Sequence, residues 1–241
     1  MNPAMDLHSG AGPPVLEPDT GAGPAAPWFG ATPVVEPGSG LARSRLRLYL
    51  IRHGETEWSL SSRHTGRTDI PLTTHGEASA RALSPWLAHV QFARVLTSPR
   101  QRARQTCELA GLGSAAEIEP DLSEWDYGDY EGRRSVDIEI VRADWNLFRD
   151  GCPHGETPAQ ICERADRLIL SLRTTRGNAA LFTHGQFASV LAARWIGLPV
   201  TDGQHLALGP ASLSILAHNA HHPAVRVIEL WNAAPDRRPG G

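Results

Sequence analysis

The chain contains no lysine, so all of its basic side chains other than histidine are arginines. This absence excludes a Schiff-base lysine and a phosphate-loop lysine as the catalytic group. Cysteine is scarce as well, with only Cys107, Cys152 and Cys162. An odd number at irregular spacing argues against a disulfide framework and against a zinc site, and it predicts three reduced thiols.

The sequence also lacks long apolar segments and a strong charge of either sign. No stretch reaches the apolar length of a membrane span. The first residues show no basic segment followed by an apolar one, so no secretory signal is expected. The net charge of −3 gives no general reason to expect nucleic acid or an anionic membrane as a partner. We therefore expect a cytoplasmic protein that binds neither, and a homodimer stays open.

The composition divides the chain into three parts. Residues 1–43 are rich in proline, glycine and alanine and have no apolar periodicity, which predicts disorder. Residues 44–232 are long enough to bury a sizeable core and are expected to form one folded domain. Residues 233–241 are expected to be a flexible tail.

Within the expected domain, short apolar runs alternate with helical patterns. The pattern predicts strands at 46–52, 94–98, 179–183, 211–217 and 225–231, and helices at 76–90, 100–111, 135–149, 157–173 and 186–197. Residues 157–160 have the pattern of a capping box, with proline at the first helical position. Strands that alternate with helices indicate an α/β protein with a largely parallel sheet covered on both faces.

Polar side chains follow three of the predicted strands. His53, Ser98 and His184 each lie just beyond a strand end. In parallel sheets, ligands bind beyond the carboxyl ends of the strands. These residues are therefore expected to contribute to one site.

The residues around His53 favour phosphoryl transfer. A neutral imidazole can attack phosphorus and form a covalent phosphohistidine. Arg52, beside it, and Arg102, in a turn that leads into a helix, carry planar guanidinium groups that match phosphate oxygens. His184, if protonated, would donate to the charge that develops in the transition state.

Glu124 lies in a glycine-punctuated loop and can serve as the acid. It would protonate the departing alkoxide and then accept a proton from the attacking water. Burial beside Trp125 and Tyr127 would raise its pKa toward neutrality.

Each of these residues also has a purely structural interpretation. A single histidine at a strand end is more often a structural hydrogen-bonding group than a nucleophile, and an arginine at a helix start is usually solvated. The joint occurrence of two His-Gly strand ends, one arginine-rich helix start and one loop acid favours catalysis. The remaining histidines, His64 among them, lack this context.

Four blocks of sequence carry a resemblance to a known family. They are residues 52–56 (Arg-His-Gly-Glu-Thr), 98–106 (Ser-Pro-x-x-Arg-Ala-x-Gln-Thr), 124–132 (Glu-x-x-Tyr-Gly-x-x-Glu-Gly) and 183–185 (Thr-His-Gly). In order and spacing they resemble the histidine phosphatase (phosphoglycerate mutase-like) superfamily over roughly residues 45–232. The resemblance implies a three-layer α/β/α sandwich, no required metal or cofactor, and a small phosphorylated metabolite as the partner.

The same resemblance implies roles for individual residues. It makes His53 the phosphorylated residue, Glu124 the acid, and Arg52, Arg102 and His184 the phosphate pocket. It also implies that the substrate is contacted by four further residues, namely Thr65, Gly66, Tyr127 and Gly185. Arg63, Arg67, Arg100 and Arg104 are either ligands for a second anionic group or surface charge.

Two departures from the mutase pattern bear on the activity. Ser59 follows Trp58 where the mutases have asparagine, and only the short segment 133–144 follows the glutamate loop, without lysine. A mutase must retain a bisphosphate intermediate, so a less enclosed and less cationic pocket favours hydrolysis. Residues 124–132 and 145–157 resemble mycobacterial-type acid phosphatases and fungal sedoheptulose-1,7-bisphosphatases.

The sequence therefore predicts a metal-independent phosphomonoesterase that acts on small phosphorylated metabolites, with sugar phosphates and bisphosphates among the substrates to test. A cofactor-dependent phosphoglycerate mutase is the alternative. A binding or regulatory protein on a retained phosphatase scaffold is a third interpretation.

Overall fold

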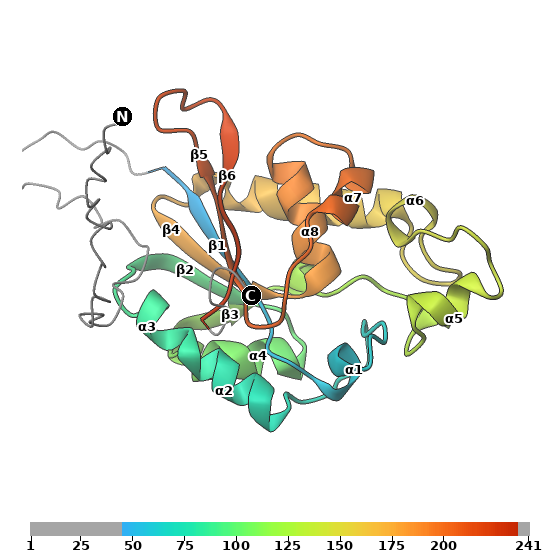
Figure 1. Cartoon of the computed structure of the whole chain (residues 1–241). Helices are drawn as coiled ribbons and strands as arrows, with labels where there is room; N and C mark the ends of the chain where they lie inside the picture. The colour runs from blue at the N-terminus through green and yellow to red at the C-terminus, as the bar shows by residue number, and fades with distance from the viewer. Residues whose placement is uncertain (1–44, 236–241) are drawn as a thin grey trace, which may run out of the picture. The chain divides into compact units, whose positions relative to one another are not determined.

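The computed structural model describes residues 45–235, so the predicted disorder of residues 1–43 lies outside the described part. Its six strands form one sheet in the order β3-β2-β4-β1-β5-β6 (Figure 1). The strands are β1 (Arg47–Arg52), β2 (Phe92–Thr97), β3 (Ala116–Ile118), β4 (Asn178–Thr183), β5 (Leu213–His218) and β6 (Arg226–Ala233). The first four are parallel, whereas β5 and β6 are antiparallel to their neighbours. The prediction of a mostly parallel sheet is confirmed.

Helices cover both faces of the sheet (Figure 1). One face packs against α2 (Thr74–Ala82), α3 (Ser84–Leu87) and α4 (Gln101–Leu109), and the other against α7 (Pro158–Ser171) and α8 (Gly185–Trp195). In β1, Leu48 and Leu50 belong to the core beside α7 and α8, while Tyr49 and Ile51 belong to the core beside α2 and α4. This alternation follows from the two-residue period of a strand. The three-layer sandwich is confirmed.

Some predicted elements differ from the structure. The helix expected at 135–149 is two short helices, α5 (Ser135–Glu139) and α6 (Leu147–Asp150). Asp144 has a positive φ of 57°, which a helix cannot contain, and Asn146 caps α6 by accepting a hydrogen bond from the Phe148 amide. The helix expected at 76–90 is divided into α2 and α3, and Pro85 lies in the first turn of α3.

Short elements account for the other differences. The edge strand β3 was not predicted, because three residues are too few to show an alternation. A one-turn helix, α1 (Glu57–Leu60), follows the Arg-His-Gly-Glu segment. The expected tail begins one residue too early, since Ala233 ends β6. Within residues 45–235 no helix has the length and apolar character needed to cross a membrane.

Three strand ends meet at one edge of the sheet. In the β1–β4 register Arg52 lies beside Thr183, and in the β2–β4 register Thr97 lies beside Phe182. The residues that follow these strands are His53, Ser98 and His184, and parallel pairing places them together. The structure thus brings together the three residues that were expected from the sequence to contribute to one site.

Candidate active site

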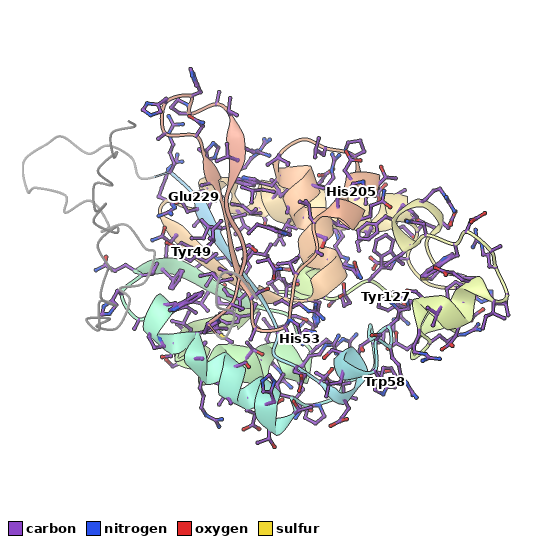
Figure 2. The ribbon with its side chains drawn as sticks, in the orientation of Figure 1. Tyr49, His53, Trp58, Tyr127, His205 and Glu229 are labelled. Carbon is purple, nitrogen blue, oxygen red and sulfur yellow. The ribbon has the colours of Figure 1, made fainter. Side chains whose placement is uncertain are left out.

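A cavity of about 430 Å³ lies at this edge of the sheet. Figure 2 shows His53 at the end of β1, with Tyr127 and Trp58 toward the loops around α1 and α5. The wall is mainly polar. Its residues are Arg52, His53, Ser59, Ser62, Arg63, His64, Thr65, Glu124, Tyr127, Ser135, Phe148, Gly185, Gln186, Ser189, Gly203, Gln204, Leu206, Ala207 and Leu208.

His53 is held as a neutral imidazole with one nitrogen available. Its Nδ1 is 2.7 Å from the Gly54 carbonyl oxygen, which can only accept, so Nδ1 carries the proton. Nε2 makes no hydrogen bond within the described residues. Burial, with Arg102 and Arg52 nearby, lowers the pKa of His53 well below its ordinary value. The unprotonated Nε2 lone pair is therefore present at neutral pH.

The backbone at Gly54, directly after His53, packs too closely against Gly76 to leave room for a side chain. A Cβ on Gly54 would lie 2.5 Å from the Gly76 carbonyl oxygen. The Gly54 amide donates to Thr106 Oγ1 at 3.0 Å, and this hydroxyl donates to the Arg102 carbonyl at 2.7 Å. The histidine is thus attached to the helix that carries Arg102.

Arg52 lines the cavity with much of its guanidinium group unpaired. Nη1 donates to the Leu208 carbonyl, whereas the buried Nε has no partner among the described residues. A Cβ on Gly185 would lie 3.3 Å from the Arg52 Cζ, so glycine leaves room for the guanidinium plane. An unpaired buried donor is costly, and an anion in the cavity would satisfy it.

Arg102 is fully buried, does not line the cavity, and is bound mainly by protein groups. Nη1 donates to the Thr68 carbonyl at 3.0 Å, and Nη2 donates to the carbonyls of Thr65 and Gly66 at 2.8 and 3.1 Å. Nε donates to His184 Nδ1 at 3.1 Å. Of its five N–H groups, one on Nη1 remains for a phosphate oxygen.

His184 is held as a neutral imidazole, whereas the donor role considered from the sequence applies to its protonated form. Its Nδ1 accepts from Arg102, so the proton lies on Nε2, which is 2.8 Å from Ser98 Oγ. Burial, followed by the charge of Arg102, lowers the pKa of His184 well below its ordinary value. Its ring centroid lies 5.2 Å from that of His53. His184 thus orients Arg102.

Glu124 accepts hydrogen bonds at the N-terminus of α8. Oε1 accepts from the Trp125 and Phe187 amides at 2.9 and 2.8 Å, and Oε2 accepts from the Gln186 amide at 3.0 Å. His184, the N-cap residue of α8, makes no side-chain cap, so Glu124 supplies it from another loop. Burial raises the pKa of Glu124, as predicted, although these amide bonds oppose the shift. Oε2 has a lone pair left for a proton.

Arg164 holds the loop that carries Glu124, and its sequence context gave no sign of this. Its Nη groups donate to the carbonyls of Asp121, Ser123 and Glu124 at 2.8, 2.6 and 3.3 Å. Nε and Nη2 also donate to the two Glu156 carboxylate oxygens at 2.8 and 2.7 Å. The guanidinium lies over the Phe187 ring at 4.4 Å. All five N–H groups are therefore used, three of them on the loop that carries Glu124, and the ring of Phe187 connects Arg164 to α8.

The predicted substrate-binding residues divide between two positions. Thr65, Tyr127 and Gly185 line the cavity. Gly66 does not, because its amide donates to Glu131 and its carbonyl accepts from Arg102, and its expected backbone contact with substrate stays a prediction. Burial raises the pKa of Tyr127 well above its ordinary value, which keeps the phenol a donor.

Only one of the four additional arginines lines the cavity. Arg63 does, whereas Arg67 pairs with Asp126 at 2.7 Å and Arg100 and Arg104 lie elsewhere on or before α4. The structure thus reduces the candidates for a second anionic group to Arg63.

Sequence reasoning missed two residues of this region. His64 lines the cavity, stacks on Tyr127 with ring centroids 4.6 Å apart, and has a pKa lowered by burial to about 4. Glu131 accepts from the amides of Gly66 and Thr68 at 2.9 and 3.0 Å, which fixes the loop whose carbonyls hold Arg102. Glu131 belongs to the sequence block 124–132, which could have identified it, whereas no sequence pattern marks His64 as a residue of the site.

Among residues 45–235 no group of three or more metal-ligating side chains comes together. The fold and the site define an α/β protein built to hold a phosphoryl group beside a neutral histidine. The sequence model of the Histidine phosphatase superfamily (branch 1) matches residues 48–232. The chain belongs to this superfamily.

Curated relatives show the same likeness. An acid phosphatase of Mycobacterium tuberculosis is 40% identical over 173 residues, 70% of this chain and 85% of the relative. A sedoheptulose 1,7-bisphosphatase of Saccharomyces cerevisiae is 37% identical over 186 residues, which cover 64% of this chain and 69% of the relative. A probable phosphoglycerate mutase of Photorhabdus laumondii is 32% identical over 181 residues, which cover 70% of this chain and 83% of the relative. A solved Mycobacterium tuberculosis structure has a TM-score of 0.73 and 36% identity, covering 78% of this chain and 98% of that one.

Proposed function

We propose that this chain hydrolyses phosphate monoesters of small metabolites through a phosphohistidine at His53, without a metal. The observation that carries the proposal is the state of His53. Its Nδ1 proton is fixed by the Gly54 carbonyl, its Nε2 is free, and its lowered pKa keeps the ring neutral. The family and the phosphatase relatives support hydrolysis as the reaction.

The first step forms the phosphohistidine. The His53 Nε2 lone pair attacks phosphorus, and the bond between phosphorus and the ester oxygen breaks. Glu124, protonated at Oε2, gives its proton to the departing alkoxide. Arg52 and the remaining N–H of Arg102 stabilise the charge on the equatorial oxygens. The dianion would also raise the pKa of His184 and favour its protonated form.

The second step releases phosphate. A water molecule attacks the phosphohistidine, and the carboxylate of Glu124 accepts its proton. The bond between phosphorus and Nε2 breaks, which returns the electron pair to the imidazole. Inorganic phosphate leaves and the enzyme regains its starting protonation.

The cavity supports a phosphorylated sugar as the substrate class. Hydroxyl and amide side chains form much of the wall beyond His53, including Ser62, Ser135 and Gln204, and these groups pair well with sugar hydroxyls. Arg63 offers a cation for a second phosphate. A bisphosphatase among the relatives agrees with this assignment.

The mutase alternative is less well supported by this cavity. A mutase must keep its bisphosphate intermediate bound while that intermediate reorients in the site, which requires strong binding of both phosphates. Arg52 and Arg63 are the arginines that line the cavity. The segment that contains α5 and α6, between residues 133 and 150, contributes no arginine to its wall. Conversion of 3-phosphoglycerate to 2-phosphoglycerate that needs 2,3-bisphosphoglycerate and exceeds hydrolysis would establish the mutase instead.

The decisive experiment measures phosphate release from p-nitrophenyl phosphate and sugar phosphates in EDTA. We expect activity in the wild type, none in His53→Ala, and full activity in His75→Ala, whose side chain is largely exposed. Rapid quenching with labelled substrate should yield a protein phosphate that is labile to acid and stable to base. Activity that survives His53→Ala, or is lost in EDTA, would contradict the mechanism.

A cytoplasmic location fits the proposed substrates, since phosphorylated sugars are metabolites of that compartment. The cysteines in the described part of the chain are free thiols, in agreement with a reducing environment. Cell fractionation with an antibody to the chain tests the location.

A further inference from the structure

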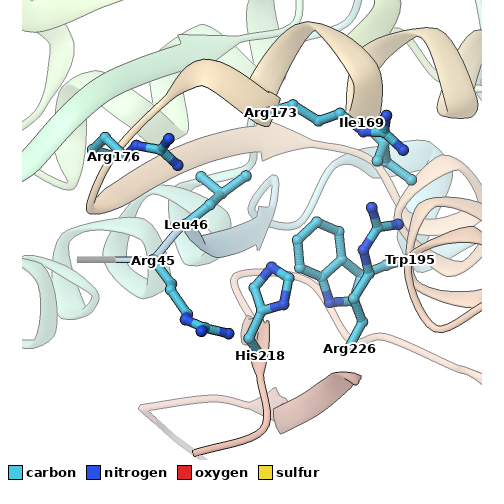
Figure 3. A pocket seen from close by; sticks show the side chains of 8 residues that line it. All are labelled: Arg45, Leu46, Ile169, Arg173, Arg176, Trp195, His218 and Arg226. Carbon is cyan, nitrogen blue, oxygen red and sulfur yellow. The ribbon is translucent and has the colours of Figure 1, made fainter. Parts of the chain in front are cut away.

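A second cavity, of about 870 Å³, lies away from the active site and is called here the distal cavity. Four arginines, one histidine and three apolar residues line it, and Figure 3 shows them: Arg45, Leu46, Ile169, Arg173, Arg176, Trp195, His218 and Arg226. No carboxylate lies among them. The active site is at the other end of α8, about 15 Å from Trp195 at the helical rise of 1.5 Å per residue.

The cations of the distal cavity come from separate parts of the chain. Arg45 precedes β1, Arg173 and Arg176 follow α7, and Arg226 begins β6. A solvated helix face would instead show charges at regular spacing on one element. Convergence on one concave surface concentrates positive charge in a protein whose net charge is −3.

The four arginines also differ from most arginines of the described chain in their partners. None forms an ion pair with a described residue. Carboxylates pair with many of the others, namely Arg47, Arg67, Arg81, Arg94, Arg134, Arg142, Arg149, Arg164, Arg167 and Arg194. The remaining unpaired arginines are Arg52, Arg63, Arg100, Arg102, Arg104 and Arg133, on the segments that carry the active site. Among the described residues, arginines without a carboxylate partner thus lie on the segments around the candidate active site and in the distal cavity.

One guanidinium of the distal cavity is held in place without use of its donors. Arg226 Cζ lies 4.7 Å from the centroid of the Trp195 ring. Trp195 is itself fixed, because its Nε1 donates to the Ala217 carbonyl at 3.1 Å and its ring edge meets His218 at a centroid distance of 5.4 Å. Arg226 makes no side-chain hydrogen bond within residues 45–235. Its N–H groups remain available to a ligand at a fixed position.

We propose that the distal cavity binds a small molecule that carries two or more phosphate groups. Guanidinium forks bind phosphate oxygens in a bidentate manner, and several of them in one cavity repel each other until an anion enters. A single phosphate would leave part of the four positive charges uncompensated, so a polyphosphorylated ligand is favoured. The apolar floor of Leu46, Ile169 and Trp195 can contact the ligand's carbon framework.

The test is calorimetric titration of the full chain with sodium tripolyphosphate while orthovanadate saturates the active site. We expect one binding event in the wild type. Arg173→Ser/Arg176→Ser should weaken it at least tenfold, and both side chains are exposed, so the fold should be retained. Arg81→Ser/Arg134→Ser is the matched control, because it removes two exposed arginines that pair with Glu77 and Asp137 and should change the affinity less than twofold.

Two results would overturn the proposal, and a third would pass the decision to another variant. Tripolyphosphate that binds only when vanadate is absent would place it in the active site. Equal weakening in both double variants would show attraction to overall charge rather than to the cavity. Vanadate affinity that falls in Arg173→Ser/Arg176→Ser would show that the variant disturbs the active site, and Arg226→Ser, whose affinity for tripolyphosphate should also fall tenfold, then decides. The comparison of the two double variants needs no phosphatase activity, so failure of this proposal and failure of the proposed function are distinguishable.

Discussion

Replacement of Arg164 by lysine should impair proton transfer by Glu124 although Arg164 touches no substrate. Lysine has three N–H donors, whereas Arg164 serves two carboxylate oxygens and three carbonyls. At least two acceptors would lose their donor. At about 1 kcal/mol for each buried acceptor, the free energy of unfolding should fall by about 2 kcal/mol. The protein should still fold, because the charge opposite Glu156 is kept.

The kinetic effect should depend on the leaving group. General acid catalysis contributes roughly 10²- to 10⁴-fold, and displacement of the acid forfeits much of it. We expect kcat/KM for glycerol 2-phosphate, whose alkoxide needs a proton, to fall about 10- to 100-fold. For p-nitrophenyl phosphate, whose phenolate leaves without one, kcat/KM should fall less than about threefold.

The assay compares kcat/KM for the two substrates, because this ratio reports the step that forms the phosphohistidine. Arg167→Lys is the control. Arg167 forms a bidentate ion pair with the carboxylate of Asp121 on the same loop, but its side chain is 60% exposed. It should change stability by about 0.5 kcal/mol or less and leave the kinetics unchanged. An equal loss of kcat/KM for both substrates in Arg164→Lys would refute a role in positioning Glu124.

Three further predictions concern single residues. Glu124→Gln should lower kcat/KM for glycerol 2-phosphate roughly 10²- to 10⁴-fold and leave kcat/KM for p-nitrophenyl phosphate nearly unchanged. Because folding raises the pKa of Glu124, this carboxyl should make the wild type lose stability as pH rises above about 4.5. Urea unfolding at several pH values should show that this loss is absent from Glu124→Gln. The His64 pKa of about 4 means that the unfolded chain takes up a proton at this position first as pH falls below 6.5, so His64 should contribute about 2 kcal/mol to a drop in stability between pH 7 and pH 5. His53 and His184, whose pKa values are lowered as well, add to the drop, and His64→Gln should reduce it by the His64 contribution. Gly185→Ala should raise KM several-fold with little change in Tm, since its Cβ would press on the Arg52 Cζ; an unchanged KM would mean that Arg52 does not grip substrate from this position.

Much of the architecture could be predicted from the sequence because it rests on local pattern. The alternating apolar residues of β1 and the capping box at Thr157 and Gln160 are signals within a few residues, and both appear in the structure. The helix expected at 135–149 was wrong because its pattern continued across Asp144, which has a left-handed backbone just before the buried Trp145. Local pattern does not record such an interruption.

The candidate site could be predicted in its parts but not in its connections. The sequence places His53, Ser98 and His184 at strand ends, and parallel pairing then brings them to one edge. No sequence pattern indicated that the amide of Gly66, a residue expected to contact substrate, donates to Glu131, 65 residues away. A hydrogen bond between distant residues leaves no periodicity or spacing in the sequence.

By itself, the sequence determined which groups are present and on which strand ends they stand: a histidine nucleophile candidate, arginines in place of lysine, and a loop glutamate. The tertiary structure alone decided how those groups are charged and oriented. Burial lowers the pKa of His53 and raises that of Glu124, and contacts across the fold orient Arg102 through His184 and Glu124 through Arg164. Desolvation and hydrogen bonding depend on what surrounds a group in space, and the chain acquires those surroundings only when it folds.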